Sequence, residues 1–160
     1  MVSTLQAKTL LIRESKLNHK SSVLNPLVKF VTEETVALLF NLKLGEIYRI
    51  DCWRHVVYVY AKGVSRFVSY ADFPPILDAQ TPIPKDFVRW RKRWKNRWRT
   101  QQAPEFWTLF YKHQFQQAAT KSELLAWGKL ISLLKSLLSV AALQQLRKVY
   151  SHEKYFWENF

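Results

Sequence analysis

The chain has 160 residues, of which 25 are Lys or Arg and 12 are Asp or Glu, so its formal net charge is +13. Hydrophobic residues make up 48% of the sequence, which excludes disorder throughout, and the length fits a single compact domain. One cysteine and three glycines exclude an intrachain disulfide, a multi-cysteine zinc site and a glycine-rich phosphate loop. We therefore expect a folded protein of the reducing cytoplasm that meets a polyanion.

The first segment, residues 1–31, is predicted to be a basic N-terminal arm. It carries five cations and one acid, and it lacks the pattern of a signal peptide. No run of about 20 apolar residues occurs in the chain, so we expect no integral membrane segment. Four cations of the arm are candidates for contacts with phosphate: Lys8, Arg13, Lys16 and Lys20.

The second segment, residues 32–83, is predicted to contain a short helix and a small sheet. Thr32 suits the N-cap of a helix over 31–41, with Glu33 and Glu34 in its first turn. Residues 46–53, 56–60 and 64–70 are rich in Val, Ile, Tyr and Phe, which favours strands. Short connections predict a three-stranded antiparallel meander, followed by a Pro-rich linker over 73–84.

The third segment, residues 84–160, is predicted to form a bundle of about four helices. Their expected ranges are 85–99, 104–119, 122–138 and 141–150, and an aromatic tail follows. We expect this tail to dock, because four exposed aromatic side chains would form a sticky patch. The predicted fold class is α+β, a small meander followed by a helical bundle.

The positive charge is concentrated at the start of this bundle. Residues 84–103 hold eight cations and one acid, whereas residues 32–83 hold five cations and six acids. Cations at this density repel one another, so the concentration indicates a surface that binds an anionic partner.

Tryptophans alternate with these cations at helical spacing. Trp90, Trp94 and Trp98 lie on one side of the predicted helix, together with Phe87. This side either packs onto the body of the protein or stacks on exposed bases. If it packs inward, the arginines face outward, where guanidinium groups match phosphate oxygens. The candidate phosphate ligands of the helix are Arg89, Arg91, Lys92, Arg93, Lys95, Arg97 and Arg99.

Other functions find less support in the sequence. Cys52 and His55 could pair as nucleophile and base, but a buried thiol beside a surface histidine is the favoured interpretation. His55 or His113 could serve a metal-independent ribonuclease. Tyr58 and Tyr60 could stack on bases or form the half-buried face of the sheet. No pattern in the sequence predicts a metal site or another cofactor. An amphipathic helix with Arg and Trp also suits binding to a membrane surface.

The function that we predict is a non-catalytic nucleic-acid-binding subunit of a ribonucleoprotein or DNA-processing assembly. RNA is favoured over DNA, because basic helices with interleaved aromatics suit single strands and irregular shapes. The alternative is a structural adaptor that binds a larger protein. Its candidate interface lies on the helix over 104–119 and on the tail: Trp107, Tyr111, Phe115, Phe156, Trp157 and Phe160.

Overall fold

A computed structural model describes residues 15–95 and 103–160, and it confirms the α+β class. The strands are β1 (Leu17–His19), β2 (Ile47–Cys52), β3 (Val57–Ala61) and β4 (Val64–Val68). The helices are α2 (Glu33–Phe40), α3 (Pro84–Lys95), α4 (Glu105–Gln117), α5 (Lys121–Leu133) and α6 (Val140–Asn159). Short 3-10 turns occupy Val28–Phe30, Leu44–Glu46 and Tyr70–Asp72.

The sheet has four strands in the order β1-β2-β3-β4, so the predicted three-stranded meander lacks one strand. Strands β2, β3 and β4 are antiparallel as predicted, whereas β1 pairs with β2 in parallel. The backbone N–H of Ile50 donates to the carbonyl of Lys16 (2.8 Å), and that of Lys20 donates to the carbonyl of Cys52 (2.9 Å). A strand of three residues is too short to show alternation, which explains why the sequence did not reveal β1.

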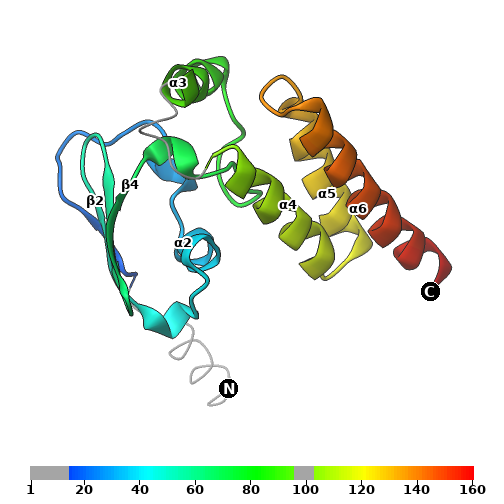
Figure 1. Cartoon of the computed structure of the whole chain (residues 1–160), viewed down its shortest axis with the longest axis horizontal. Helices are drawn as coiled ribbons and strands as arrows, with labels where there is room; N and C mark the ends of the chain where they lie inside the picture. Colours follow the sequence, from blue (N-terminus) through cyan, green and yellow to red (C-terminus); the bar gives the residue numbers. More distant parts are fainter. Residues whose placement is uncertain (1–14, 96–102) are drawn as a thin grey trace, which may run out of the picture.

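The segment predicted as an N-terminal arm is, from β1 onward, part of the folded body. Leu27, Phe30 and Val31 are buried in the hydrophobic core. Thr32 then caps α2 as predicted, because its side-chain oxygen accepts a hydrogen bond from the backbone N–H of Thr35. Helix α2 lies between the sheet and α4 (Figure 1), where Val36 is fully buried.

The helices that the structure describes cover one face of the sheet (Figure 1). Along β3, Val57, Val59 and Ala61 are buried against this side, whereas Tyr58 and Tyr60 point the other way. The hairpin between β3 and β4 turns at Gly63, whose φ of +72° is a left-handed conformation that glycine adopts without strain. The sheet therefore has an apolar side that belongs to the core and an aromatic side that none of the described helices covers.

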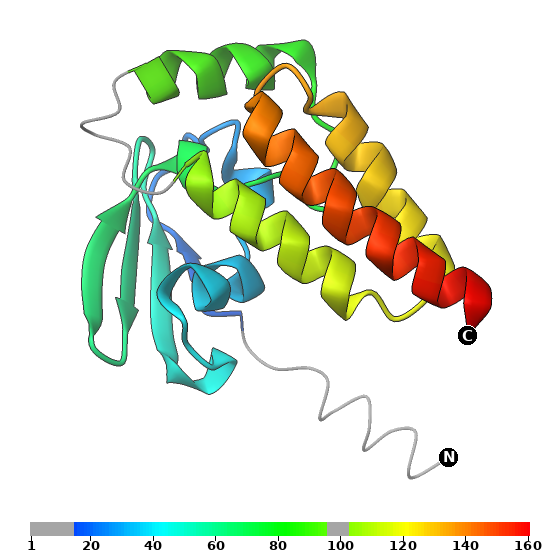
Figure 2. The ribbon, with the colours of Figure 1, turned by 45° about the vertical axis from the view of Figure 1, so that its right-hand side comes forward.

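The described residues contain the four predicted C-terminal helices, with changes at two of their ends. The helix expected over 122–138 ends at Leu133, because the backbone at Leu134 (φ −97°, ψ 6°) departs from the helix. Helix α6 continues through the predicted tail to Asn159, because no glycine or proline interrupts this stretch. Three aromatic side chains of the tail, Tyr155, Phe156 and Phe160, are 63%, 51% and 88% exposed, so the expected docking of the tail is wrong. Helices α4, α5 and α6 lie side by side, and α3 crosses beyond their end (Figure 2).

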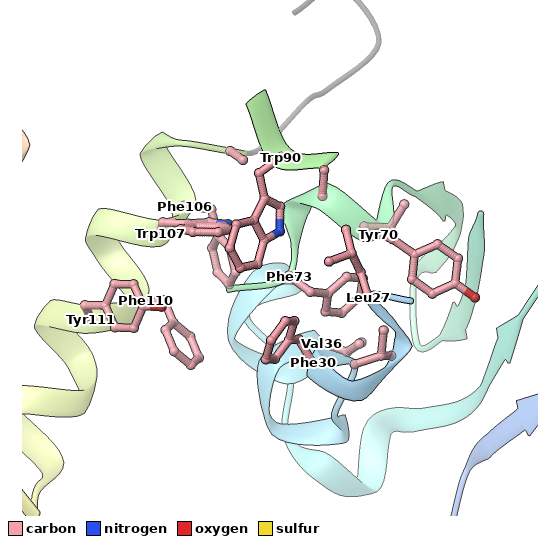
Figure 3. Packing of buried hydrophobic residues seen from close by; sticks show 14 of the residues in the cluster. Leu27, Phe30, Val36, Tyr70, Phe73, Trp90, Phe106, Trp107, Phe110 and Tyr111 are labelled. Carbon is pink, nitrogen blue, oxygen red and sulfur yellow. The ribbon is translucent and has the colours of Figure 1, made fainter. Parts of the chain in front are cut away.

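Aromatic side chains join α3 to the rest of the body. Figure 3 shows Trp90 beside Trp107 of α4 and above the core residues Phe30 and Phe73. The centroid of the Trp90 ring lies 5.1 Å from that of Trp107 and 5.7 Å from that of Phe30. This packing fixes the orientation of α3 and hence the direction in which its cations point.

Candidate nucleic-acid interface

The inward side of α3 is formed by two of the predicted tryptophans. Trp90 is fully buried. Trp94 is half-buried, and its indole N–H donates to the carbonyl of Ala71 (3.0 Å). The Trp94 ring also meets the Trp107 ring edge to face, with 4.7 Å between their centroids. The tryptophan side is therefore core, and the third member, Trp98, lies outside the described residues.

The single acid in the basic segment is held inside the protein. Asp86 is fully buried, and its carboxylate accepts hydrogen bonds from the backbone N–H of Ile83 (3.0 Å) and from Arg89 (3.2 Å). Its second ion pair is with Lys29, 2.8 Å away. Buried carboxylates need such partners, so this negative charge is not available to the neighbouring cations on the surface.

The remaining cations of α3 differ in how they are used. Arg91 donates to the hydroxyl of Ser136 (2.8 Å), and its guanidinium lies 5.8 Å from the centroid of the Phe87 ring. Lys92, Arg93 and Lys95 are exposed on the outer side. The predicted Arg97 and Arg99 lie outside the described residues.

A cavity of about 410 Å³ lies beside this outer side. Arg89, Lys92 and Arg93 line it from α3, and His55 lines it from the turn between β2 and β3. The wall is completed by uncharged residues: Asn25, Pro26, Leu27, Ser69, Tyr70 and Ala71. Among the described residues, the lining of this cavity includes no carboxylate, so its electrostatic potential favours anions.

A second cavity of about 420 Å³ adjoins the first one, since both are lined by Ser69 and Arg93. Its other cation is Arg66 of the edge strand β4, and its aromatic wall is Phe67. The guanidinium of Arg66 lies 5.7 Å from the centroid of the Phe40 ring. We call the two cavities together the basic groove. Sequence reasoning assigned Arg66 no role, because its distance from α3 along the chain hides their proximity.

Of the four candidate cations of the predicted arm, the two that the structure describes, Lys16 and Lys20, do not line this groove. The ammonium of Lys16 donates to the carbonyl of Leu44 (2.7 Å), so Lys16 has a structural contact. Lys20 is exposed and follows β1. Lys8 and Arg13 lie outside the described residues.

The predicted adaptor interface is divided by the structure. Trp107, Tyr111 and Phe115 are at most 2% exposed, which makes them part of the chain's own core and not a surface for a partner. The hydroxyl of Tyr111 donates to the carbonyl of Pro75 (2.9 Å), and burial raises the pKa of this tyrosine. Phe156, Trp157 and Phe160 lie at the exposed end of α6.

The candidate catalytic residues lie in different surroundings. Cys52 is 2% exposed, and burial raises the pKa of its thiol to about 11, so little of it is thiolate near neutral pH. His55 is exposed in the basic groove, whereas His113 is exposed on α4, which contributes no residue to that groove. The described residues contain no group of three or more His, Cys, Asp or Glu side chains that could hold a metal ion.

Comparisons with known proteins add no relative. No family model matches the chain, and neither the curated proteins nor the solved structures contain a match. Within residues 15–95 and 103–160, no helix combines the length and hydropathy needed to cross a bilayer.

Proposed function

We propose that the chain is a non-catalytic nucleic-acid-binding subunit, with RNA favoured over DNA, of a ribonucleoprotein or DNA-processing assembly. The observation that supports this function most is the basic groove, whose described lining holds Arg66, Lys92 and Arg93 and no carboxylate. Arg89 also lines the groove, but it is paired with the buried Asp86. Phosphates of a nucleic-acid backbone are the polyanion that such a row of cations fits.

The packing of the α3 tryptophans favours a nucleic acid over a membrane surface as the partner of this helix. Since Trp90 and Trp94 are committed to the core, α3 has no free indole side to insert among lipid headgroups. What α3 presents is the side with Lys92, Arg93 and Lys95. This side also carries an exposed valine, Val88, but cations outnumber it, and such a side suits phosphates in water better than the interface of a bilayer.

The test compares two variants with the same change in net charge. Lys92→Glu with Arg93→Glu reverses two cations of the groove, and Arg147→Glu with Lys148→Glu reverses two exposed cations of α6. Fluorescence anisotropy with labelled single-stranded RNA, single-stranded DNA and duplex measures the affinities. We expect the groove variant to lose about tenfold or more in affinity for its best ligand, and the α6 variant to lose much less.

Equal losses in both variants would mean that net charge alone attracts nucleic acid, and would overturn the groove as the site. Binding of anionic vesicles in preference to every nucleic acid would contradict the proposed ligand class. All four residues are exposed, so their substitution leaves the core intact.

A second candidate function, a structural adaptor, rests on the exposed end of α6. Phe156 and Phe160 stack with 5.3 Å between their ring centroids, and Trp157 lies next to them. An aromatic cluster on a helix end is a frequent anchor in protein–protein interfaces. The two functions are compatible, because subunits of nucleoprotein assemblies bind both protein and nucleic acid.

A further inference from the structure

The uncovered face of the sheet carries four aromatic side chains. Tyr48, Tyr60 and Phe67 are 54%, 40% and 63% exposed, and Tyr58 is half-buried between its neighbours. They come from three adjacent strands, and the register pairs Tyr58 directly with Phe67. In Figure 1, no helix within residues 15–95 and 103–160 lies over this side of the sheet. We call these four side chains the aromatic platform.

The rings of the aromatic platform are held in two close pairs. The centroids of Tyr48 and Tyr60 lie 5.1 Å apart, and those of Tyr58 and Phe67 also lie 5.1 Å apart. The guanidinium of Arg49 lies 4.9 Å from the centroid of Tyr60 and 6.0 Å from that of Tyr58. The hydroxyls of Tyr58 and Ser65 hydrogen-bond each other across the hairpin. The platform is therefore ordered before any ligand arrives, which lowers the entropic cost of binding.

Cross-strand aromatic pairs stabilise sheets by themselves, and this role explains part of the arrangement. It does not explain Phe67, which has no polar group and leaves most of its ring in water. The carboxylate of Asp51 on this face is 5% exposed and bound by Arg49 (3.0 Å) and Asn18 (3.4 Å). Arg49 and Asp51 therefore neutralise each other, and the rings themselves favour a partner with flat apolar groups.

The aromatic platform is continuous with the basic groove. Phe67 belongs to the platform and, together with Arg93 of α3, lines the same cavity of about 420 Å³. Side chains suited to bases and side chains suited to phosphates therefore adjoin at the edge of β4. A single nucleic-acid strand offers these two chemical groups at neighbouring positions, whereas a duplex keeps its bases stacked inside.

We propose that the aromatic platform binds the unpaired bases of a single-stranded nucleic acid whose phosphates occupy the basic groove. This inference rests on the proposed function and deepens it, because it selects single strands over duplexes. Phe67 and Tyr48 offer the most exposed rings for stacking, and Arg49 orders the ring of Tyr60, the neighbour of Tyr48, from one side.

The experiment removes one ring from each close pair, Tyr60 and Phe67, and keeps the strands. Tyr60→Thr with Phe67→Thr substitutes β-branched residues that favour strands, and Tyr60→Phe keeps the ring as a matched control. The probes are a labelled oligouridine of about 12 nucleotides, an abasic strand of equal length and a duplex. We expect the double variant to lose about tenfold or more in affinity for oligouridine, with unchanged affinity for the abasic strand. Tyr60→Phe should bind all three probes like the unaltered chain.

Three results would overturn the inference. One is equal loss of affinity for oligouridine and the abasic strand, and another is unaltered oligouridine binding by the double variant. The third is a concentration-dependent dimer in sedimentation that the double variant abolishes, because the platform would then bind a second copy. If Lys92→Glu with Arg93→Glu weakens binding while the ring variant does not, the proposed function stands without the platform. If the unaltered chain binds none of the probes, both proposals fail.

Discussion

The ammonium of Lys29 lies 2.8 Å from Oδ2 of Asp86, and this ion pair joins the segment before α2 to the first turn of α3. Arg89, one turn further along α3, contacts the other carboxylate oxygen at 3.2 Å. Asp86 thus forms ion pairs with Lys29, which lies outside α3, and with Arg89, which lies within it. Lys92 and Arg93, farther along α3, are exposed to solvent and line the basic groove.

Removal of the Asp86 carboxylate is expected to destabilise the fold. Asp86→Ala leaves Lys29 and Arg89, which are partly buried, without their shared partner, and it removes the acceptor for the Ile83 N–H. We expect the free energy of unfolding to fall by about 3 kcal/mol, measured by urea denaturation. Asp78→Ala, at an exposed carboxylate, is the control and should cost less than about 0.5 kcal/mol. Equal effects of the two substitutions would contradict this role.

Gly128 in α5 is expected to resist replacement even by alanine. A Cβ atom there would lie 2.6 Å from the ring of Tyr150, which packs against Phe115. Alanine favours helices by about 1 kcal/mol over glycine, whereas overpacking costs about 1–3 kcal/mol. We therefore expect Gly128→Ala to lower the melting temperature.

The same substitution in a Tyr150→Ala background tests whether the Tyr150 ring causes this loss of stability. With Tyr150→Ala present, the obstructing ring is gone, and Gly128→Ala should raise stability through helix propensity. Destabilisation of equal size in both backgrounds would show that Tyr150 is not the obstacle.

The Cys52 thiol is expected to give the fold a dependence on alkaline pH. Burial raises its pKa to about 11, whereas the unfolded thiol ionises near about 8.5. Between these two values the folded state holds a proton that the unfolded state has lost, so this contribution to stability falls as pH rises. Urea denaturation should show a steeper loss of stability from pH 9 to about 11 for the unaltered chain than for Cys52→Ala.

Labelling with iodoacetamide gives a second measurement of the same thiol. We expect negligible reaction in the native protein at mildly alkaline pH and rapid reaction in urea. Rapid native labelling would mean that Cys52 opens to solvent.

Binding of single-stranded nucleic acid is expected to weaken steeply with salt. Each phosphate contact contributes about 0.7 to the slope of log affinity against log salt. Lys92→Gln with Arg93→Gln should lower that slope by roughly 1.4, measured by anisotropy between roughly 50 and 200 mM salt. An unchanged slope would mean that neither residue contacts phosphate.

Local patterns predicted the parts of the fold that local physics decides. Thr32 caps α2 because its hydroxyl meets a backbone N–H three residues away, a relationship contained in the sequence. The spacing of Trp90 and Trp94 predicted the inward side of α3 in the same way. Strand β1 was not predicted, because what defines it is the pairing of Leu17 with Ile50, a contact between segments far apart in the sequence.

The candidate site depended more on tertiary contacts. Arg91 and Lys92 are neighbours of similar chemistry, yet one contacts Ser136 and the other lines the basic groove. No sequence pattern separates them. Tyr58 and Tyr60 were visible as an alternating pair, whereas their pairing with Phe67 and Tyr48 requires the register of the sheet and the irregularity between Ile47 and Arg49.

Parallel pairing of β1 with β2 also sets the order in which the sheet can assemble. Asn18 contacts Asp51 across 33 residues of chain, whereas the hairpins between β2, β3 and β4 close over short turns. Closing the longer loop costs more entropy, so hairpin formation is the faster event and the N-terminal strand adds to a sheet that already exists. We therefore expect β1, the first of the described strands, to pair last. Until β1 pairs, β2 is then an edge strand of a three-stranded sheet, and its outer edge is the one that β1 later occupies.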